Sequence, residues 1–246
     1  MNNELLLLSK NDIPFKEAQV NIHQPTIKEI SLIGEDTFRL ACQFLIFSKD
    51  NLSDKDKVVL ENSSDFDIIM SIMNEPSGVK YRFMVYLLLT LLFPKLEIDF
   101  KRDKIALLGK DEQKDFCTEI NSENFNAFKD ILKNIFNIEK TEGDGQYNPS
   151  DGLAKRIAEK FKKRQEQLAK RKDGNGKIAI YSRYISILAV GLQKDMNELM
   201  EYTVYQLEDE FKRFQLKQTF DFYRQAKLAG AQDLDEVDNW MDDIHP

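Results

Sequence analysis

The side chains that most often bind metals or act as nucleophiles are few and far apart in this sequence. The two histidines, His23 and His245, lie near opposite ends of the 246 residues, and the two cysteines, Cys42 and Cys117, have no CxxC spacing. A zinc site needs several such ligands close together, and a catalytic triad needs a histidine beside its nucleophile. We therefore predict no metal site and no catalytic residues. Two separate cysteines also fit a reducing compartment.

Motifs for phosphate, calcium or acyl chemistry are missing or incomplete. The stretch EGDGQYN lacks the Lys-Ser/Thr ending of a Walker loop, and no Gly-x-Ser-x-Gly elbow occurs. The stretch DLDEVDNWMDD has closely spaced carboxylates, but it lacks the glycine and terminal glutamate of an EF-hand loop. We interpret it as a solvated helix face, and a carboxylate-only metal site stays open as the alternative. The sequence thus predicts a protein that is not an enzyme and has no cofactor.

Charge gathers in two segments of opposite sign. Residues 155–177 hold ten Lys or Arg and three acidic residues, a local net charge of +7, in a chain whose net charge is −7. Residues 233–243 hold six acidic residues and no basic one. We rank three interpretations of the basic segment: a solvated helix, attraction to the acidic segment of the same or another copy, and contact with nucleic acid. The candidate electrostatic contacts are Lys162, Lys163, Arg164, Lys170 and Arg171.

Strand and helix patterns alternate in the first 140 residues. Apolar runs at 5–8 and 20–22 predict strands, and the runs at 96–100 and 105–107, separated by a polar turn, predict a β-hairpin. The apolar run FMVYLLLTLLFP is shorter than the roughly 20 residues that span a bilayer, so we expect a buried helix and no membrane partner. Further expectations are helices at 35–47 and 63–75, a third strand within 115–120, and a helix N-capped by Asn121 or Ser122.

Helical patterns fill the rest of the chain. Thr203 and Gln206 have the spacing of a capping box, as do Thr26 and Glu29 earlier, and Gly191 can end the preceding helix. We predict a helix-rich α+β protein. Its parts are an α+β domain with the β-hairpin at 1–140, a linker at 141–152, and an all-helical domain at 153–246 that carries the basic helix and an acidic amphipathic C-terminal helix.

Aromatic residues near the C-terminus are the candidates for binding a partner. Phe211 and Phe214 lie on the core stripe of the long helix, whereas Tyr205 and Phe222 fall off it and are expected at the surface. Trp240, the only tryptophan, lies on the apolar stripe of the terminal helix. It either anchors that helix on its own domain, which we rank first, or contacts a partner. The predicted partner-binding residues are Tyr205, Phe211, Phe214, Phe222 and Trp240.

Two stretches resemble a known family. They are VNIHQPTIKEISLIGEDTFRLACQFL and MNELMEYTVYQLEDEFKRFQLKQTFDFYRQAKLAGAQDLDEVDNWMDDI, about a third of the chain. They are similar to the tail assembly chaperones encoded beside the tape-measure gene of long-tailed phages and prophages. In that family a short helix, a Thr-capped helix with Gln-Leu and a Trp near the end recur. The basic segment and the β-hairpin lie outside the resemblance.

The resemblance implies a non-enzymatic role in the host cell cytoplasm. Members of the family bind the tape-measure protein and help recruit tail tube protein, so these two proteins are the expected partners, together with other copies in a homo-oligomer. Two alternatives remain open: a structural virion component of the tail, neck or baseplate, and a nucleic-acid-binding accessory protein, which we rank last.

Overall fold

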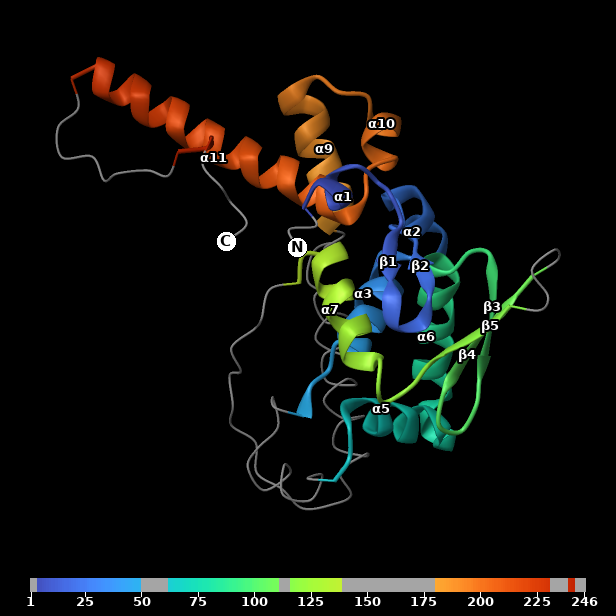
Figure 1. Cartoon of the computed structure of the whole chain (residues 1–246). Helices are drawn as coiled ribbons and strands as arrows, with labels where there is room; N and C mark the ends of the chain where they lie inside the picture. Colours follow the sequence, from blue (N-terminus) through green and yellow to red (C-terminus); the bar gives the residue numbers. More distant parts are fainter. Residues whose placement is uncertain (1–3, 50–61, 111–115, 139–179, 231–238, 242–246) are drawn as a thin grey trace.

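A computed structural model describes residues 4–49, 62–110, 116–138, 180–230 and 239–241. Helices dominate, and a small antiparallel sheet and a two-stranded hairpin lie in the first half (Figure 1). The predicted helix-rich α+β class is confirmed. Within the described residues, no helix combines the length and apolar character needed to cross a membrane.

The chain begins with a helix where the sequence pattern predicted a strand. Helix α1 (Glu4–Leu8) contains four consecutive leucines, which favour helix more than the β-branched residues typical of strands. Only Leu7 is buried, and Leu5 is 81% exposed. The strand prediction at 5–8 was therefore wrong, because an unbroken run of leucines is compatible with the periodicity of a helix as well as that of a strand. The first strands are β1 (Ile13–Phe15) and β2 (Val20–Ile22), joined by a short 3-10 turn.

A three-stranded sheet lies beside α6 at one side of the first half (Figure 1). Strand β4 (Ile105–Gly109) pairs with both β3 (Leu96–Phe100) and β5 (Cys117–Ile120), so the predicted hairpin and third strand are both present. Helix α6 (Val79–Leu92) is the predicted apolar helix, and it packs on α3 (Glu35–Leu45) and β3. The remaining helices are α2 (Ile27–Ile33), α5 (Asp65–Asn74) and α7 (Phe125–Ile135).

Helix α7 begins later than its predicted caps. Its N-cap is Asn124, whose side chain makes no bond to the following backbone N–H groups. Asn121 instead uses Oδ1 to accept from the N–H groups of Glu123 and Asn124, at 3.0 and 3.3 Å. Asn121 therefore stabilises a turn that comes just before the helix, because its side chain accepts from the backbone N–H groups of that turn.

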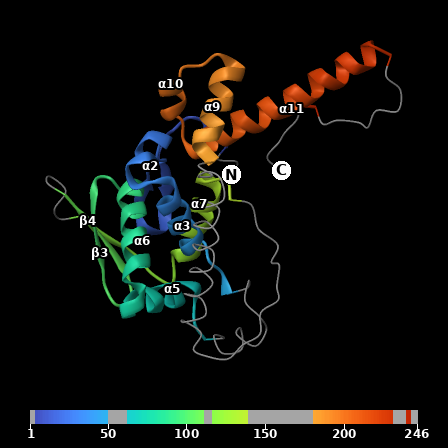
Figure 2. The same cartoon turned by 180° about the vertical axis from the view of Figure 1, so that it is seen from behind.

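The described C-terminal part consists of α9 (Ile180–Leu192), α10 (Met196–Met200) and α11 (Val204–Leu228). Both capping boxes are present, at Thr26 with Glu29 and at Thr203 with Gln206. Helix α9 continues past Gly191 and ends before Gln193, whose backbone is left-handed with φ of 56°. Figures 1 and 2 both show α11 extending well beyond α9 and α10.

The two halves share one hydrophobic core. The cluster of buried side chains runs from Leu7 to Phe211 and includes Tyr181, Leu188 and Leu207. At the junction, Thr26 and Thr203 form an isolated antiparallel bridge, and the Ile27 N–H donates to the Tyr202 carbonyl at 2.9 Å. The N-termini of α2 and α11 are thus held together. The domain boundaries at 140, 152 and 153 fall outside the described residues and stay predictions.

Candidate functional site: a cleft along helix α11

The first turns of α11 are fixed by hydrogen bonds to the N-terminal part of the chain. Gln206 uses both ends of its amide: Oε1 accepts from the Thr203 N–H at 3.0 Å, and Nε2 donates to the Leu8 carbonyl at 2.5 Å. One side chain therefore caps the N-terminus of α11. It also donates to a carbonyl at the C-terminus of α1, where the last carbonyls have no partner within the helix. This contact places Leu8 beside α11.

Helix α9 supports α11 through close aromatic packing. The rings of Tyr184 and Phe211 stack with centroids 3.7 Å apart and an angle of 12° between their planes. One turn further along α11, the Phe214 ring lies against Gly191, where a Cβ atom would overlap the ring. Gly191 thus allows a close approach of the two helices, a role different from the predicted helix stop.

A cleft with a volume of about 500 Å³ lies along this part of α11. We call it the α11 cleft. Its walls come from the end of α1, the end of α9, the first half of α11 and the Trp240 segment. The lining residues are Leu8, Leu192, Tyr202, Gln206, Asp209, Glu210, Arg213, Phe214, Lys217 and Trp240. This volume is in the range of sites that bind small ligands or single large side chains.

The charged groups of the α11 cleft are arranged in pairs. Lys194 donates to Glu210 and to the Tyr202 hydroxyl, both at 2.7 Å. Burial lowers the pKa of Lys194, but these two bonds outweigh burial and hold its pKa above the usual range. Arg213 pairs with Asp209 at 3.4 Å and Lys217 with Asp221 at 2.6 Å. Paired charges leave apolar contact and backbone hydrogen bonding as the binding chemistry of the cleft.

Trp240 is half-buried and forms one wall of the cleft. Its backbone carbonyl accepts a hydrogen bond from Arg213 Nη1 at 3.2 Å. Met241 beside it is 65% exposed. Trp240 therefore lies against its own chain, as in the interpretation ranked first. Both residues lie in a turn; Leu234, Val237 and Ile244 of the predicted terminal helix lie outside the described residues.

The five predicted partner-binding residues do not form one surface. Tyr205 is only 4% exposed, so its expected place at the surface was wrong. The bridge between Thr26 and Thr203 holds the first turn of α11 against the core, which covers positions off the main stripe as well. Phe211 is also buried, Phe214 and Trp240 line the α11 cleft, and Phe222 is 73% exposed further along the helix.

Several residues of the cleft were missed at the level of sequence. Asp209, Arg213, Lys217 and Asp221 follow one another at four-residue spacing, a pattern that predicts one charged face of a helix. That spacing could have identified this face. Leu8 had no local signal, since it comes from the other end of the chain. The predicted electrostatic contacts Lys162, Lys163, Arg164, Lys170 and Arg171 lie outside the described residues.

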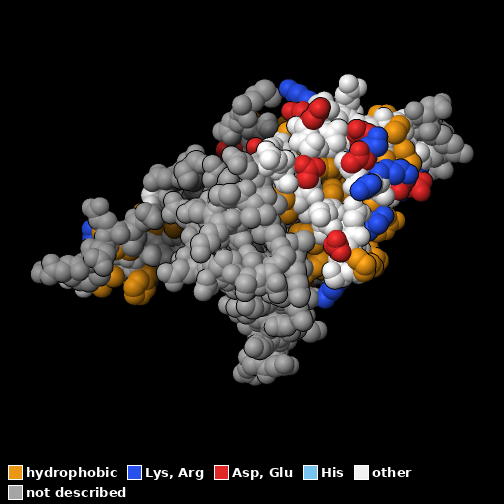
Figure 3. All heavy atoms as spheres, turned by 90° about the horizontal axis from the view of Figure 1, so that it is seen from below, with side chains coloured by type: hydrophobic (Ala, Val, Ile, Leu, Met, Phe, Trp, Pro, Cys, Tyr) orange, Lys and Arg blue, Asp and Glu red, His pale blue; other side chains and the backbone are white. Residues whose placement is uncertain are grey.

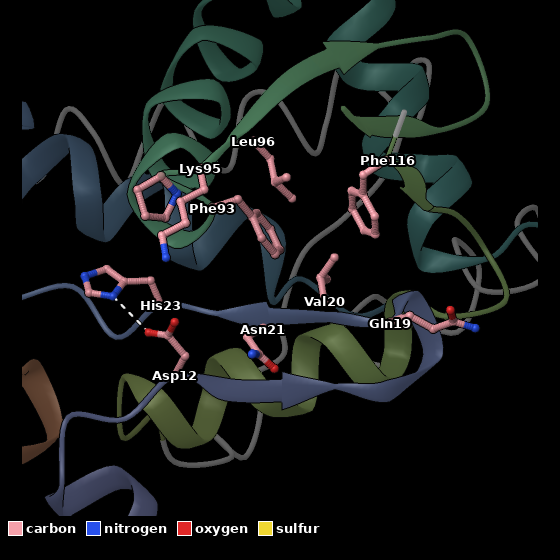
Figure 4. A pocket seen from close by; sticks show the side chains of 10 residues that line it. Asp12, Gln19, Val20, Asn21, His23, Phe93, Lys95, Leu96 and Phe116 are labelled. Carbon is pink, nitrogen blue, oxygen red and sulfur yellow. Dashed lines mark hydrogen bonds and ion pairs between the residues drawn. The ribbon is translucent and has the colours of Figure 1, made fainter. Parts of the chain in front are cut away.

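A second pocket, of about 490 Å³, lies between β2 and the end of the three-stranded sheet. Figure 4 shows Val20 facing Phe93, Leu96 and Phe116 across an apolar space. At its rim, His23 Nδ1 lies 3.1 Å from Asp12 and Nε2 lies 3.2 Å from Glu29.

The chemistry of this second pocket is limited by its lining. Among the described residues that line it, the ionisable side chains are Asp12, His23 and Lys95, and His23 is held between Asp12 and Glu29. Across the described ranges, no three His, Cys, Asp or Glu side chains are grouped so that they could hold a metal ion. Seen from below, acidic and basic side chains are interspersed with apolar ones on the described surface (Figure 3).

Part of the chain is similar to a known protein family. Residues 177–245 match the family model described as the YomV second domain. The match begins just before α9, continues to the acidic C-terminus, and contains the whole second stretch of the tail chaperone resemblance. No curated protein and no solved structure matches the chain. The similarity to the YomV second domain suggests a phage- or prophage-type protein.

Proposed function

We propose that this protein is a non-enzymatic tail assembly chaperone, which binds the tape-measure protein in the host cytoplasm and assists assembly of the tail tube. One observation carries the proposal: α11 is anchored in the core at its start and presents apolar side chains to solvent further along. Its first turns are buried through Leu207 and Phe211, whereas Phe222 and Leu228 are 73% and 83% exposed. An anchored, projecting helix of this kind suits helix-to-helix contact with a client.

The client chemistry fits the same surface. A tape-measure protein has long apolar stripes, which need cover until the tube encloses them. Exposed apolar residues next to the α11 cleft offer such cover, and the paired charges of the cleft leave little unpaired charge to desolvate there. The similarity to a phage-type domain over residues 177–245 covers this surface and supports the same assignment. Tail tube protein and further copies of the chain are the other proposed partners.

Co-expression with the tape-measure protein of the same genome tests the proposal. We expect the client to become soluble and to co-elute with this protein in pull-down and size-exclusion experiments. Phe222→Ala should weaken the complex about tenfold, the effect of losing about 1.4 kcal/mol at an aromatic anchor. Val190→Ala is the control, because Val190 is an equally exposed apolar residue, 79% exposed, on α9 and not on α11. A client that stays insoluble would contradict the chaperone function.

A structural virion component is the second candidate, and a separate exposed face favours it. Val79, Phe83 and Tyr86 lie at helical spacing on α6 and are 64%, 61% and 40% exposed. A protein with apolar faces on both α6 and α11 can contact two neighbours, as assembled subunits do. Its stable presence in purified particles, with Phe83→Ser particles lacking it, would identify this role. Binding to nucleic acid through the 155–177 segment should instead fall steeply with salt.

A further inference from the structure

A short segment of the chain itself borders the α11 cleft. Residues 239–241 lie near α11 (Figure 1), and Trp240 lines the cleft together with Leu8 of α1 and Leu192 of α9. The position of this segment is defined by Arg213, which donates to the Trp240 carbonyl at 3.2 Å and is itself oriented by Asp209 at 3.4 Å. A tryptophan side chain and its backbone carbonyl thus already contact this face of α11 at the edge of the cleft.

Residues 239–241 are only partly covered by the rest of the protein. Trp240 is half-buried, Met241 is 65% exposed, and the cleft keeps a volume of about 500 Å³ with Trp240 in place. A fully packed core residue would leave no such space. Phe214, whose ring position is set by Gly191, and Leu192 offer further apolar contact that a larger occupant could use. The cleft therefore fits more of an occupant than Trp240 alone supplies.

We propose that the α11 cleft is a docking site for a peptide segment that carries tryptophan or another large aromatic residue, and that residues 239–241 are its internal, displaceable occupant. An incoming segment takes the place of Trp240, and Arg213 donates to a carbonyl of that segment. That the incoming segment belongs to the tape-measure protein rests on the proposed function. The occupancy of the cleft by Trp240 does not.

Fluorescence of Trp240 tests the internal contact, because the chain has one tryptophan. We expect blue-shifted emission and weak quenching by acrylamide in the full chain. Arg213→Ala should shift the emission to the red and raise the quenching constant several-fold. Arg224→Ala, an exposed arginine on the same helix, removes the same charge away from the cleft and should change neither quantity. Equal quenching in all three proteins would overturn the internal contact.

A peptide added in trans tests displacement. The probe is a fluorescein-labelled peptide of residues 229–246, AGAQDLDEVDNWMDDIHP, and a second peptide has alanine in place of its tryptophan. We expect the first peptide to bind the Trp240→Ala protein at least about tenfold more tightly than the wild-type protein, in which the internal segment competes. The second peptide should bind neither protein. Circular dichroism and thermal melting of Trp240→Ala verify that it is folded.

The possible outcomes separate this proposal from the proposed function. Equal binding of the peptide to both proteins, or no binding to Trp240→Ala, overturns the docking site whatever the client does. If the peptide binds as expected but the tape-measure protein stays insoluble on co-expression, the docking site stands and the chaperone function fails. If both succeed, the labelled peptide should be released from Trp240→Ala by the soluble client.

Discussion

Two glutamates accept hydrogen bonds from backbone N–H groups at helix N-termini, yet the pKa values of their carboxyl groups are shifted in opposite directions. Burial raises the pKa of Glu35, and the bonds from Ile180 and Tyr181 at 2.7 and 3.4 Å offset this only in part. Burial also raises the pKa of Glu29, but bonds from Thr26 and His23 outweigh it and place that pKa below the ordinary value of 4.5. The difference arises from the number of donors around each carboxylate.

These shifts predict opposite pH dependence for two matched substitutions. A raised folded-state pKa stabilises the protein fully below the ordinary value of 4.5, and this contribution is lost as the pH rises through the folded pKa. Wild type should therefore lose stability relative to Glu35→Gln between about pH 4 and about pH 7. For Glu29 the contribution is full above 4.5 and is lost as the pH falls, so wild type should gain relative to Glu29→Gln over the same interval.

Urea unfolding of the three proteins at both pH values gives the two differences in unfolding free energy. Each substitution keeps one oxygen acceptor and removes the charge that titrates, so the same chemical change is made at both sites and each variant is the control for the other. Parallel changes in the two differences would contradict the assignment of opposite shifts.

Gly191 should resist even the smallest side chain. In Gly191→Ala the new methyl group overlaps the Phe214 ring, and such overpacking costs about 1–3 kcal/mol. Alanine also favours helix over glycine by about 1 kcal/mol, so the net loss of unfolding free energy should be about 1 kcal/mol. Trp240 emission should shift as well, because Phe214 lines the same cleft. Ser186→Ala, at an exposed position of α9, should leave both quantities unchanged.

At the level of elements, the hydrogen bonds of the second capping box explain why it contains glutamine and not glutamate. Glu29 closes the first box as a carboxylate, but Gln206 also donates to the Leu8 carbonyl, which a carboxylate cannot do. Gln206→Glu should keep the cap and lose this exposed bond, which costs about 0.5–1.5 kcal/mol because water can replace the lost donor. Thermal unfolding measures the loss. Gln215→Glu, exposed on the same helix, is the control, and an equal effect there would contradict the explanation.

Local sequence signals predicted most helices and strands, but they failed where contacts between distant residues determine the structure. The capping boxes at Thr26 and Thr203, the β-hairpin and α6 follow from side-chain type and spacing, which act within a few residues. The leucine run at 5–8 became helix because its period is ambiguous, and Tyr205 became buried because the bridge to Thr26 covers it. Contacts between distant residues are not encoded in a local pattern.

For the molecule as a whole, one core predicts one unfolding transition. Leu207 on α11 and Leu45 on α3 are both fully buried, and each belongs to the same hydrophobic cluster. Leu207→Ala and Leu45→Ala should each lower the unfolding free energy by about 2–5 kcal/mol. Both should move a single transition that far-UV circular dichroism and Trp240 fluorescence report at the same temperature. Two separated transitions would mean that the halves at 1–140 and 153–246 unfold independently.

The candidate site was predictable only in the parts that α11 and the Trp240 segment supply. Phe214 and Trp240 were named from their aromatic character, and the charged face of α11 has a regular spacing in the sequence. Leu8 and Leu192 join them through the fold alone, since the Gln206 bond and the contact at Gly191 bring these residues to α11. The sequence could therefore indicate a binding helix, but the cleft beside it required the structure.

The α11 cleft joins Leu8 to Trp240, almost the full span of the sequence. During translation Leu8 is synthesised early, and more than 200 residues are added before Trp240. A nascent copy of this chain therefore lacks the Trp240 wall of the cleft until residue 240 has been added. Loss of residues 239–246 through a premature stop codon should leave a folded core with an open-sided cleft, visible as a chain of normal melting temperature that has lost its tryptophan signal.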